Sequence, residues 1–94
     1  MITDNIKNHY ETMVMDYLAS LPIYAEQQDD QGFLQDVVCV ALNQLPSKYV
    51  RHTIDLVFYM TIPEMQKMET MVKQAVDNAI QTVKKHLEGP QREA

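Results

Sequence analysis

Polar, basic and aromatic residues gather in one stretch of the chain, between residues 43 and 53. Lysine and arginine there could neutralise phosphates, arginine can also contact a guanine edge or stack on a base, and tyrosine offers a ring face. If the stretch is extended, Tyr49, Arg51 and Thr53 share one face of a strand. The candidate ligand-binding residues are Asn43, Lys48, Tyr49, Arg51, His52 and Thr53.

These residue types also have a purely structural interpretation. Asn43 could end a helix, Tyr49 could be half-buried, and Lys48 and Arg51 could be solvated surface residues. Composition alone favours this second interpretation over a binding site. Both remain open at the level of residue types.

Catalytic and metal chemistry find little support in the sequence. One cysteine and three scattered histidines do not have the spacing of a zinc site. Asp29, Asp30 and Asp36 are explained by a loop and a helix start, where carboxylates are favourable. The two glycines, Gly32 and Gly89, do not form a phosphate-binding loop. We therefore expect a protein that is not an enzyme and that has no cofactor and no metal.

The charge and the cysteine content restrict the partners and the compartment. Thirteen acidic against eight basic residues give a net charge of -5, which repels a phosphate backbone, so direct DNA binding is not expected. Cys39 cannot form an internal disulfide and is interpreted as a core thiol. No signal-peptide pattern follows Met1, and no stretch has the roughly 18 apolar residues of a membrane span. We expect a cytoplasmic protein without a membrane segment.

A chain of 94 residues makes one domain, which we place at residues 1–94 with an ordered core at about 3–88. Apolar residues at helical spacing predict a first helix over residues 4–20, with Thr3 and Asp4 as N-caps and Pro22 ending it. Residues 24–32 are polar and aperiodic, which predicts a loop, with Asp29 or Asp30 capping the next helix.

The second predicted helix, residues 33–45, is apolar nearly all round and stops at Pro46. Such a helix is expected to be buried, partly against a second subunit. Residues 48–59 alternate at period two and predict an extended segment with a short strand, a short helix being the alternative. A single strand has no partner in this chain, so we expect it to pair with its copy in a dimer or to lie across a helix.

The third predicted helix runs from residue 61 to about 87. Thr61 and Glu64 have the spacing of a capping box, Pro63 lies in the first turn, and a Gly-Pro pair at 89–90 marks the end. Three methionines at positions 65, 68 and 71 form a stripe that we interpret as core. A promiscuous peptide-binding groove is the alternative, because methionine adapts to varied partners.

Residues 36–50 read Asp-Val-Val-Cys-Val-Ala-Leu-Asn-Gln-Leu-Pro-Ser-Lys-Tyr-Val. This stretch resembles the signature of the late competence protein ComFB family, which has an Asp-Val start, an Ala-Leu-Asn helix end and then Leu-Pro-x-x-Tyr-Val. The resemblance extends over residues 2–88. Family members are small, mostly helical dimers without enzymatic activity, and are associated with cyclic di-AMP and cyclic di-GMP. Many carry a zinc-holding cysteine cluster before the Asp-Val, but residues 26–35 contain no cysteine, so metal binding does not carry over.

The resemblance implies a mostly α, three-helix domain with a short extended or β segment between helices two and three, acting as a homodimeric cyclic dinucleotide receptor. Arginine reads the guanine edge well, which slightly favours cyclic di-GMP. The alternative hypothesis is a ligand-free dimeric interaction module involved in competence or motility. Such a module would dock a downstream protein through exposed methionine and aromatic side chains.

Overall fold

The computed structural model describes residues 2–52 and 59–88, and within them the chain is mostly helical, as predicted. A short 3-10 turn, η1 (Ile2–Asn5), and a short strand, β1 (Lys7–Asn8), lead into α1 (His9–Ser20). Two further helices follow, α2 (Pro22–Glu26) and α3 (Gln31–Asn43). After them come a second short strand, β2 (Tyr49–Val50), and the long helix α5 (Ile62–Glu88).

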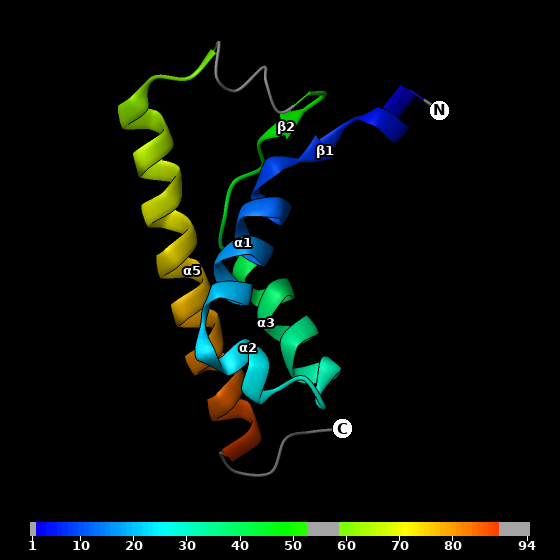
Figure 1. The fold of residues 1–94 in the computed structure, drawn as a ribbon, viewed down its shortest axis with the longest axis vertical. Helices are drawn as coiled ribbons and strands as arrows, with labels where there is room; N and C mark the ends of the chain where they lie inside the picture. The colour runs from blue at the N-terminus through cyan, green and yellow to red at the C-terminus, as the bar shows by residue number, and fades with distance from the viewer. Residues whose placement is uncertain (1, 53–58, 89–94) are drawn as a thin grey trace.

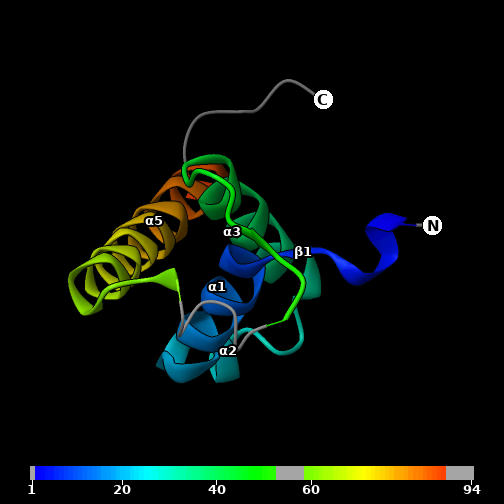
Figure 2. The same cartoon turned by 90° about the horizontal axis from the view of Figure 1, so that it is seen from above.

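The longest helix, α5, runs along most of the molecule and packs against both α3 and α1 (Figure 1). The two strands lie at the end where α1 and α5 begin, and α2 lies at the opposite end (Figure 1). The view from above shows the same three long helices grouped side by side (Figure 2). Each of them therefore contributes one face to a shared interior.

That interior is an apolar core drawn from all three long helices. The largest fully buried side chains are Leu18, Val14, Val37 and Val76. Helix α5 contributes the most positions, at helical spacing, because its apolar stripe is continuous. The buried hydrophobic residues are Tyr10, Val14, Leu18, Phe33, Leu34, Val37, Ala41, Met68, Val72, Ala75, Val76, Ala79, Ile80 and Val83.

The start of the first helix differs from the prediction. Helix α1 begins at His9 and not at residue 4, because Asn8 is its N-cap, with its side-chain oxygen accepting a hydrogen bond from the Tyr10 amide at 3.2 Å. Residues 7 and 8 are extended because they pair with another strand. The predicted loop at 24–32 is also partly wrong, since Pro22 starts the short helix α2.

The second helix spans Gln31–Asn43 and not 33–45, because Asp30 caps it by accepting from the Phe33 amide at 3.0 Å. Within this single chain α3 buries one face only, through Phe33, Leu34, Val37 and Ala41, and the expected burial of the rest against a second subunit stays a prediction. The interpretation of Cys39 as a core thiol is wrong, since Cys39 is exposed. The apolar residues of α3 outnumber the positions that α1 and α5 can cover.

The extended segment after α3 is confirmed, but the predicted pairing is wrong. Strand β2 pairs with β1 of the same chain, antiparallel, with Lys7 opposite Val50 and Asn8 opposite Tyr49. The strand is only two residues long, and residues 53–58 of the predicted segment lie outside the described residues. The last helix is as predicted, and the Glu64 amide donates to the Thr61 hydroxyl at 3.2 Å.

Candidate functional site

The segment that follows α3 is fastened to the start of α1 by hydrogen bonds. The Asn8 side-chain oxygen, which caps α1, also accepts from the Lys48 amide at 2.9 Å. The His9 amide donates to the Lys48 carbonyl at 2.7 Å. Both polar groups of the Lys48 backbone are thus bonded to residues about forty positions earlier. The backbone that carries the predicted site is held where the first helix begins.

The predicted site residues that the structure describes are exposed, but they are not all brought to one place. Lys48, Arg51 and His52 are exposed, and Tyr49 is 65% exposed. The strand ends at Val50 and Arg51 lies in a bend, so strand pairing fixes the position of Tyr49 only. Thr53, predicted to share that face, lies outside the described residues.

Asn43 is the last residue of α3, which confirms its predicted place at a helix end. It is exposed, and it is not among the residues that line the cavity next to Lys48. Nothing in the described part of the chain brings its side chain to the other candidate residues. Asn43 therefore contributes only by ending α3, after which residues 44–48 lead to the site.

A cavity of about 290 Å³ adjoins Lys48. Two lysines from distant parts of the chain, Lys48 and Lys67 of α5, contribute to its lining, together with the carboxylate-bearing Glu64 and the hydroxyl-bearing Ser47. The charged lining residues thus carry a net charge of +1. The full lining is Tyr10, Pro46, Ser47, Lys48, Met60, Glu64, Lys67, Met68 and Met71. A cavity with apolar walls and a few polar groups is typical of small-molecule sites.

Sequence reasoning missed Lys67, Ser47 and Tyr10 as members of this site. Tyr10 is buried, and its burial raises the pKa of the phenol above its ordinary value of 10.0, so the hydroxyl stays protonated near neutral pH. These residues were missed because the sequence does not show that Lys7 pairs with Val50, and this pairing joins the start of α1 to the segment after α3. Only Asn8, a good N-cap directly before helical periodicity, could have indicated it.

The charges are distributed unevenly along the chain. No lysine or arginine occurs from residue 8 to residue 47, while six acidic residues do. Four of the eight basic residues, Lys7, Lys48, Arg51 and Lys67, belong to the strands, to the bend after them or to the early turns of α5. These four basic residues are concentrated at the end of the molecule with the strands, where the acidic residues Asp4, Glu11 and Glu64 also lie.

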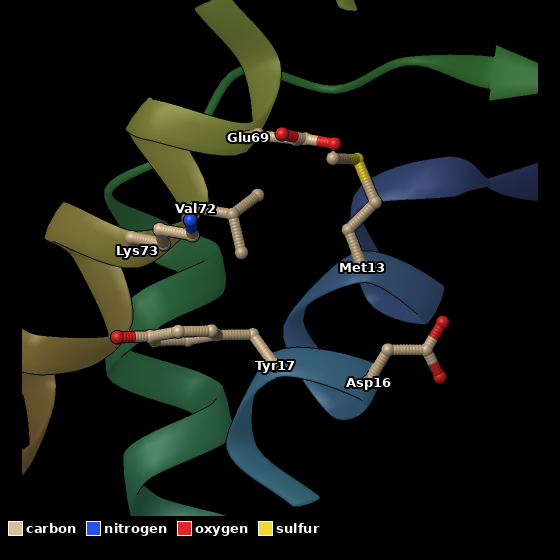
Figure 3. Close-up of a pocket in the computed structure, with 6 residues that line it drawn as sticks. All are labelled: Met13, Asp16, Tyr17, Glu69, Val72 and Lys73. Atoms are coloured by element: carbon tan, nitrogen blue, oxygen red, sulfur yellow. The ribbon is translucent and has the colours of Figure 1, made fainter. Parts of the chain in front are cut away.

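A second cavity, of about 400 Å³, lies between α1 and α5, and Figure 3 shows its lining. Tyr17 extends from α1 toward α5, and its hydroxyl donates to the Asp77 carboxylate at 3.0 Å. Burial, and then the bond to Asp77 and its charge, raise the pKa of Tyr17. Higher up, Met13 and Glu69 reach toward each other across the gap (Figure 3). This cavity combines an apolar floor with acidic groups.

Among residues 2–52 and 59–88, no three His, Cys, Asp or Glu side chains form a group that could hold a metal ion. In the same part of the chain, every helix is too short or too polar to cross a bilayer.

The fold and the cavity beside Lys48 define a small helical protein with a candidate ligand site at the end that carries the strands. The family model of the late competence development protein ComFB matches residues 7–87. The chain belongs to this family, which confirms the resemblance seen in its sequence. No curated protein and no solved structure matches the chain.

Proposed function

We propose that this protein is a non-enzymatic, dimeric, cytoplasmic receptor for a cyclic dinucleotide, either cyclic di-GMP or cyclic di-AMP. The observation that carries the proposal is the anchoring of Lys48 by Asn8 and His9 beside a cavity that Lys67 also lines. Two cations at one cavity suit a ligand with two phosphates. Membership of the ComFB family is consistent with such a ligand, since the family is associated with cyclic dinucleotides.

Each exposed side chain has a role that fits its chemistry. Lys48 and Lys67 neutralise phosphate oxygens, and Tyr49 stacks on a base because most of its ring is free. Arg51 contacts a phosphate or the O6 and N7 atoms of guanine, and His52 donates a hydrogen bond. The apolar cavity wall, including Met68, packs against the ligand's uncharged faces.

The size of the cavity is the reason to propose a dimer. A volume of about 290 Å³ lies at the lower limit of the roughly 300–1,000 Å³ of pockets for drug-sized ligands, and so suits one nucleotide and not two. A cyclic dinucleotide has two equivalent halves, and a two-fold dimer presents two equivalent cavities. We therefore expect one ligand for every two chains.

The test is a titration of the purified protein with cyclic di-GMP and with cyclic di-AMP, using GMP and AMP as controls. A ligand at a hundred times its dissociation constant should stabilise the fold by about 2.7 kcal/mol, seen as a raised melting temperature. Calorimetry should give half a ligand per chain. Binding should be lost in Lys48→Ala and Arg51→Ala, while the melting temperatures of the free proteins stay unchanged.

The matched control is Lys85→Ala, which removes an exposed lysine near the far end of α5. It should bind as the wild type does. No stabilisation by either cyclic dinucleotide well above micromolar concentration would contradict the proposal, as would equal losses in Lys48→Ala and Lys85→Ala.

A further inference from the structure

Two adjoining cavities lie between α1 and α5. A smaller cavity of about 150 Å³, lined by His9, Met13, Met60, Met65, Met68 and Glu69, continues the cavity of about 400 Å³ described above. The two share Met13 and Glu69, so together they form one groove that we call the α1–α5 groove. It shares Met60 and Met68 with the lining of the Lys48 cavity, and Met68 and Val72 connect it to the core.

Four of the seven methionines of the chain, Met13, Met60, Met65 and Met68, line the α1–α5 groove. Methionine is unbranched and polarizable, and it repacks around apolar partners of different shape. Met68 is nearly buried, at 7% exposure, whereas Met13, Met60 and Met65 are only half-buried. The groove therefore has an adaptable apolar floor that is accessible from outside.

The borders of the groove are acidic. Glu69 of α5 is exposed and lines both cavities, and Asp16 of α1 lines the larger one. Asp77 lies beside them through its bond to Tyr17, and Lys73 is the one lysine or arginine among the lining residues. Helix α1 contains no lysine or arginine to offset these charges. An apolar floor between acidic borders is complementary to an amphipathic segment with a basic outer face.

We propose that the α1–α5 groove docks a basic amphipathic helix of a partner protein. The lining residues of α5 run from Met65 to Lys73, about 12 Å of helix at 1.5 Å per residue, which is enough for about two turns of a bound helix. Leucine-type side chains on the bound helix pack against the methionines of the groove, and the lysines and arginines of the bound helix face Glu69 and Asp16.

A second copy of this chain does not suit the groove. A two-fold contact would place the acidic α1 of each copy against the Glu69 of the other, and the whole chain carries a net charge of -5. Like charges facing each other across an interface are unfavourable. A basic segment of a different protein meets no such repulsion.

The test uses a fluorescent synthetic peptide of about 15 residues, with leucine at helical spacing on one face and lysine elsewhere. Anisotropy should report binding that weakens with added salt. Glu69→Lys should weaken it by about tenfold, because an attractive pair becomes a repulsive one. The matched control is Asp36→Lys on the exposed surface of α3, which makes the same change in net charge and should leave the affinity within about twofold.

Three results would overturn this proposal. The first is equal weakening by Glu69→Lys and Asp36→Lys, which would reduce the binding to overall charge. The second is equal binding of a scrambled peptide of the same composition. The third is a wild-type dimer that Glu69→Lys dissociates while the peptide does not bind, which would make a second copy the occupant. Lys48→Ala should leave peptide binding unchanged, so the docking surface and the nucleotide site are tested independently.

Discussion

The helical body and the end that carries the two strands are stabilised in different ways. In the body, Val14, Leu18, Val37 and Val76 have no more than 2% of their surface exposed, and three helices surround them. At the other end, two pairs of strand residues and the side chain of Asn8 hold the chain together, while Tyr49 is 65% exposed. Isolated two-stranded ribbons of this kind are only marginally stable in water.

This difference between the two regions suggests that the helical body provides the stability of the fold and that the end with the strands provides ligand recognition. Burial of apolar surface supplies most of the free energy of folding, so the body can be stable without the strands. The end with the strands contributes little burial, and its exposed side chains are available for a ligand. Substitutions in the two regions should therefore have different signatures, large in stability for the body and large in binding for the strand end.

The largest effect is expected in the body, from Leu18→Ala. The side chain is fully buried, so its loss removes apolar contacts and leaves a cavity, at a cost of about 3 kcal/mol in the free energy of unfolding. Urea denaturation followed by circular dichroism measures this. The control, Ile62→Ala at a position 67% exposed, should change stability by less than about 0.5 kcal/mol. Similar costs at both positions would show that the core is misplaced.

The next effect is expected where the two regions meet, from Asn8→Ala. One side chain caps α1 and accepts from the Lys48 amide, so both bonds are lost together. We expect a loss of about 1–2 kcal/mol in the free energy of unfolding, together with weaker nucleotide binding. Asn78→Ala removes only an exposed bond to Gln44 and should have less than about a third of that effect. Unchanged binding in Asn8→Ala would show that the anchoring of Lys48 is irrelevant to the site.

A smaller effect is expected from Tyr17→Phe, which removes the hydrogen bond to Asp77 at the surface and should cost about 0.5–1 kcal/mol. Because folding raises the pKa of Tyr17, the neutral phenol stabilises the fold. That contribution is fully present below the ordinary pKa of 10.0 and is lost as the pH rises through the raised value. Urea midpoints measured between about pH 8 and pH 11 should fall less steeply in Tyr17→Phe than in the wild type. Parallel curves would argue against the bond.

The smallest effect is expected from Cys39→Ser, because the thiol of Cys39 is exposed on α3. We expect a change of less than about 0.5 kcal/mol, and iodoacetamide should alkylate the wild-type thiol without unfolding. Val37→Ala, two residues earlier but fully buried, should cost more. A thiol that resists alkylation in the native protein would mean that a second chain covers this face of α3.

Local signals predicted the helices well. Thr61 and Glu64 mark the start of α5, and Asp30 caps α3, because a cap depends on residues only a few positions apart. The start of α1 was mispredicted because Thr3 and Asp4 are equally good caps locally. Pairing of Lys7 with Val50 overrides that preference and leaves Asn8 as the cap.

The candidate site could be predicted only in part, because sequence patterns report residues that are close together along the chain. Lys48, Tyr49, Arg51 and His52 are close in sequence, so their enrichment was visible. Lys67 joins the Lys48 cavity only through the packing of α5, which no short pattern encodes. Apolar periodicity likewise shows which residues of α3 share a face, but not which face another helix covers, and so Cys39 was wrongly taken as core.

Met60 and Met68 line both the Lys48 cavity and the α1–α5 groove. A rotamer change of Met60 or Met68 that enlarges one of the two recesses makes the other smaller, because both recesses are lined by the same two side chains. If a nucleotide and a peptide prefer different rotamers of Met68, each lowers the affinity for the other, and if they prefer the same rotamer, each raises it. Thermodynamic linkage requires the factor to be identical in both directions. If both proposals hold, the wall formed by Met60 and Met68 would couple the nucleotide site to the peptide groove, so that a ligand in one recess changes the affinity at the other.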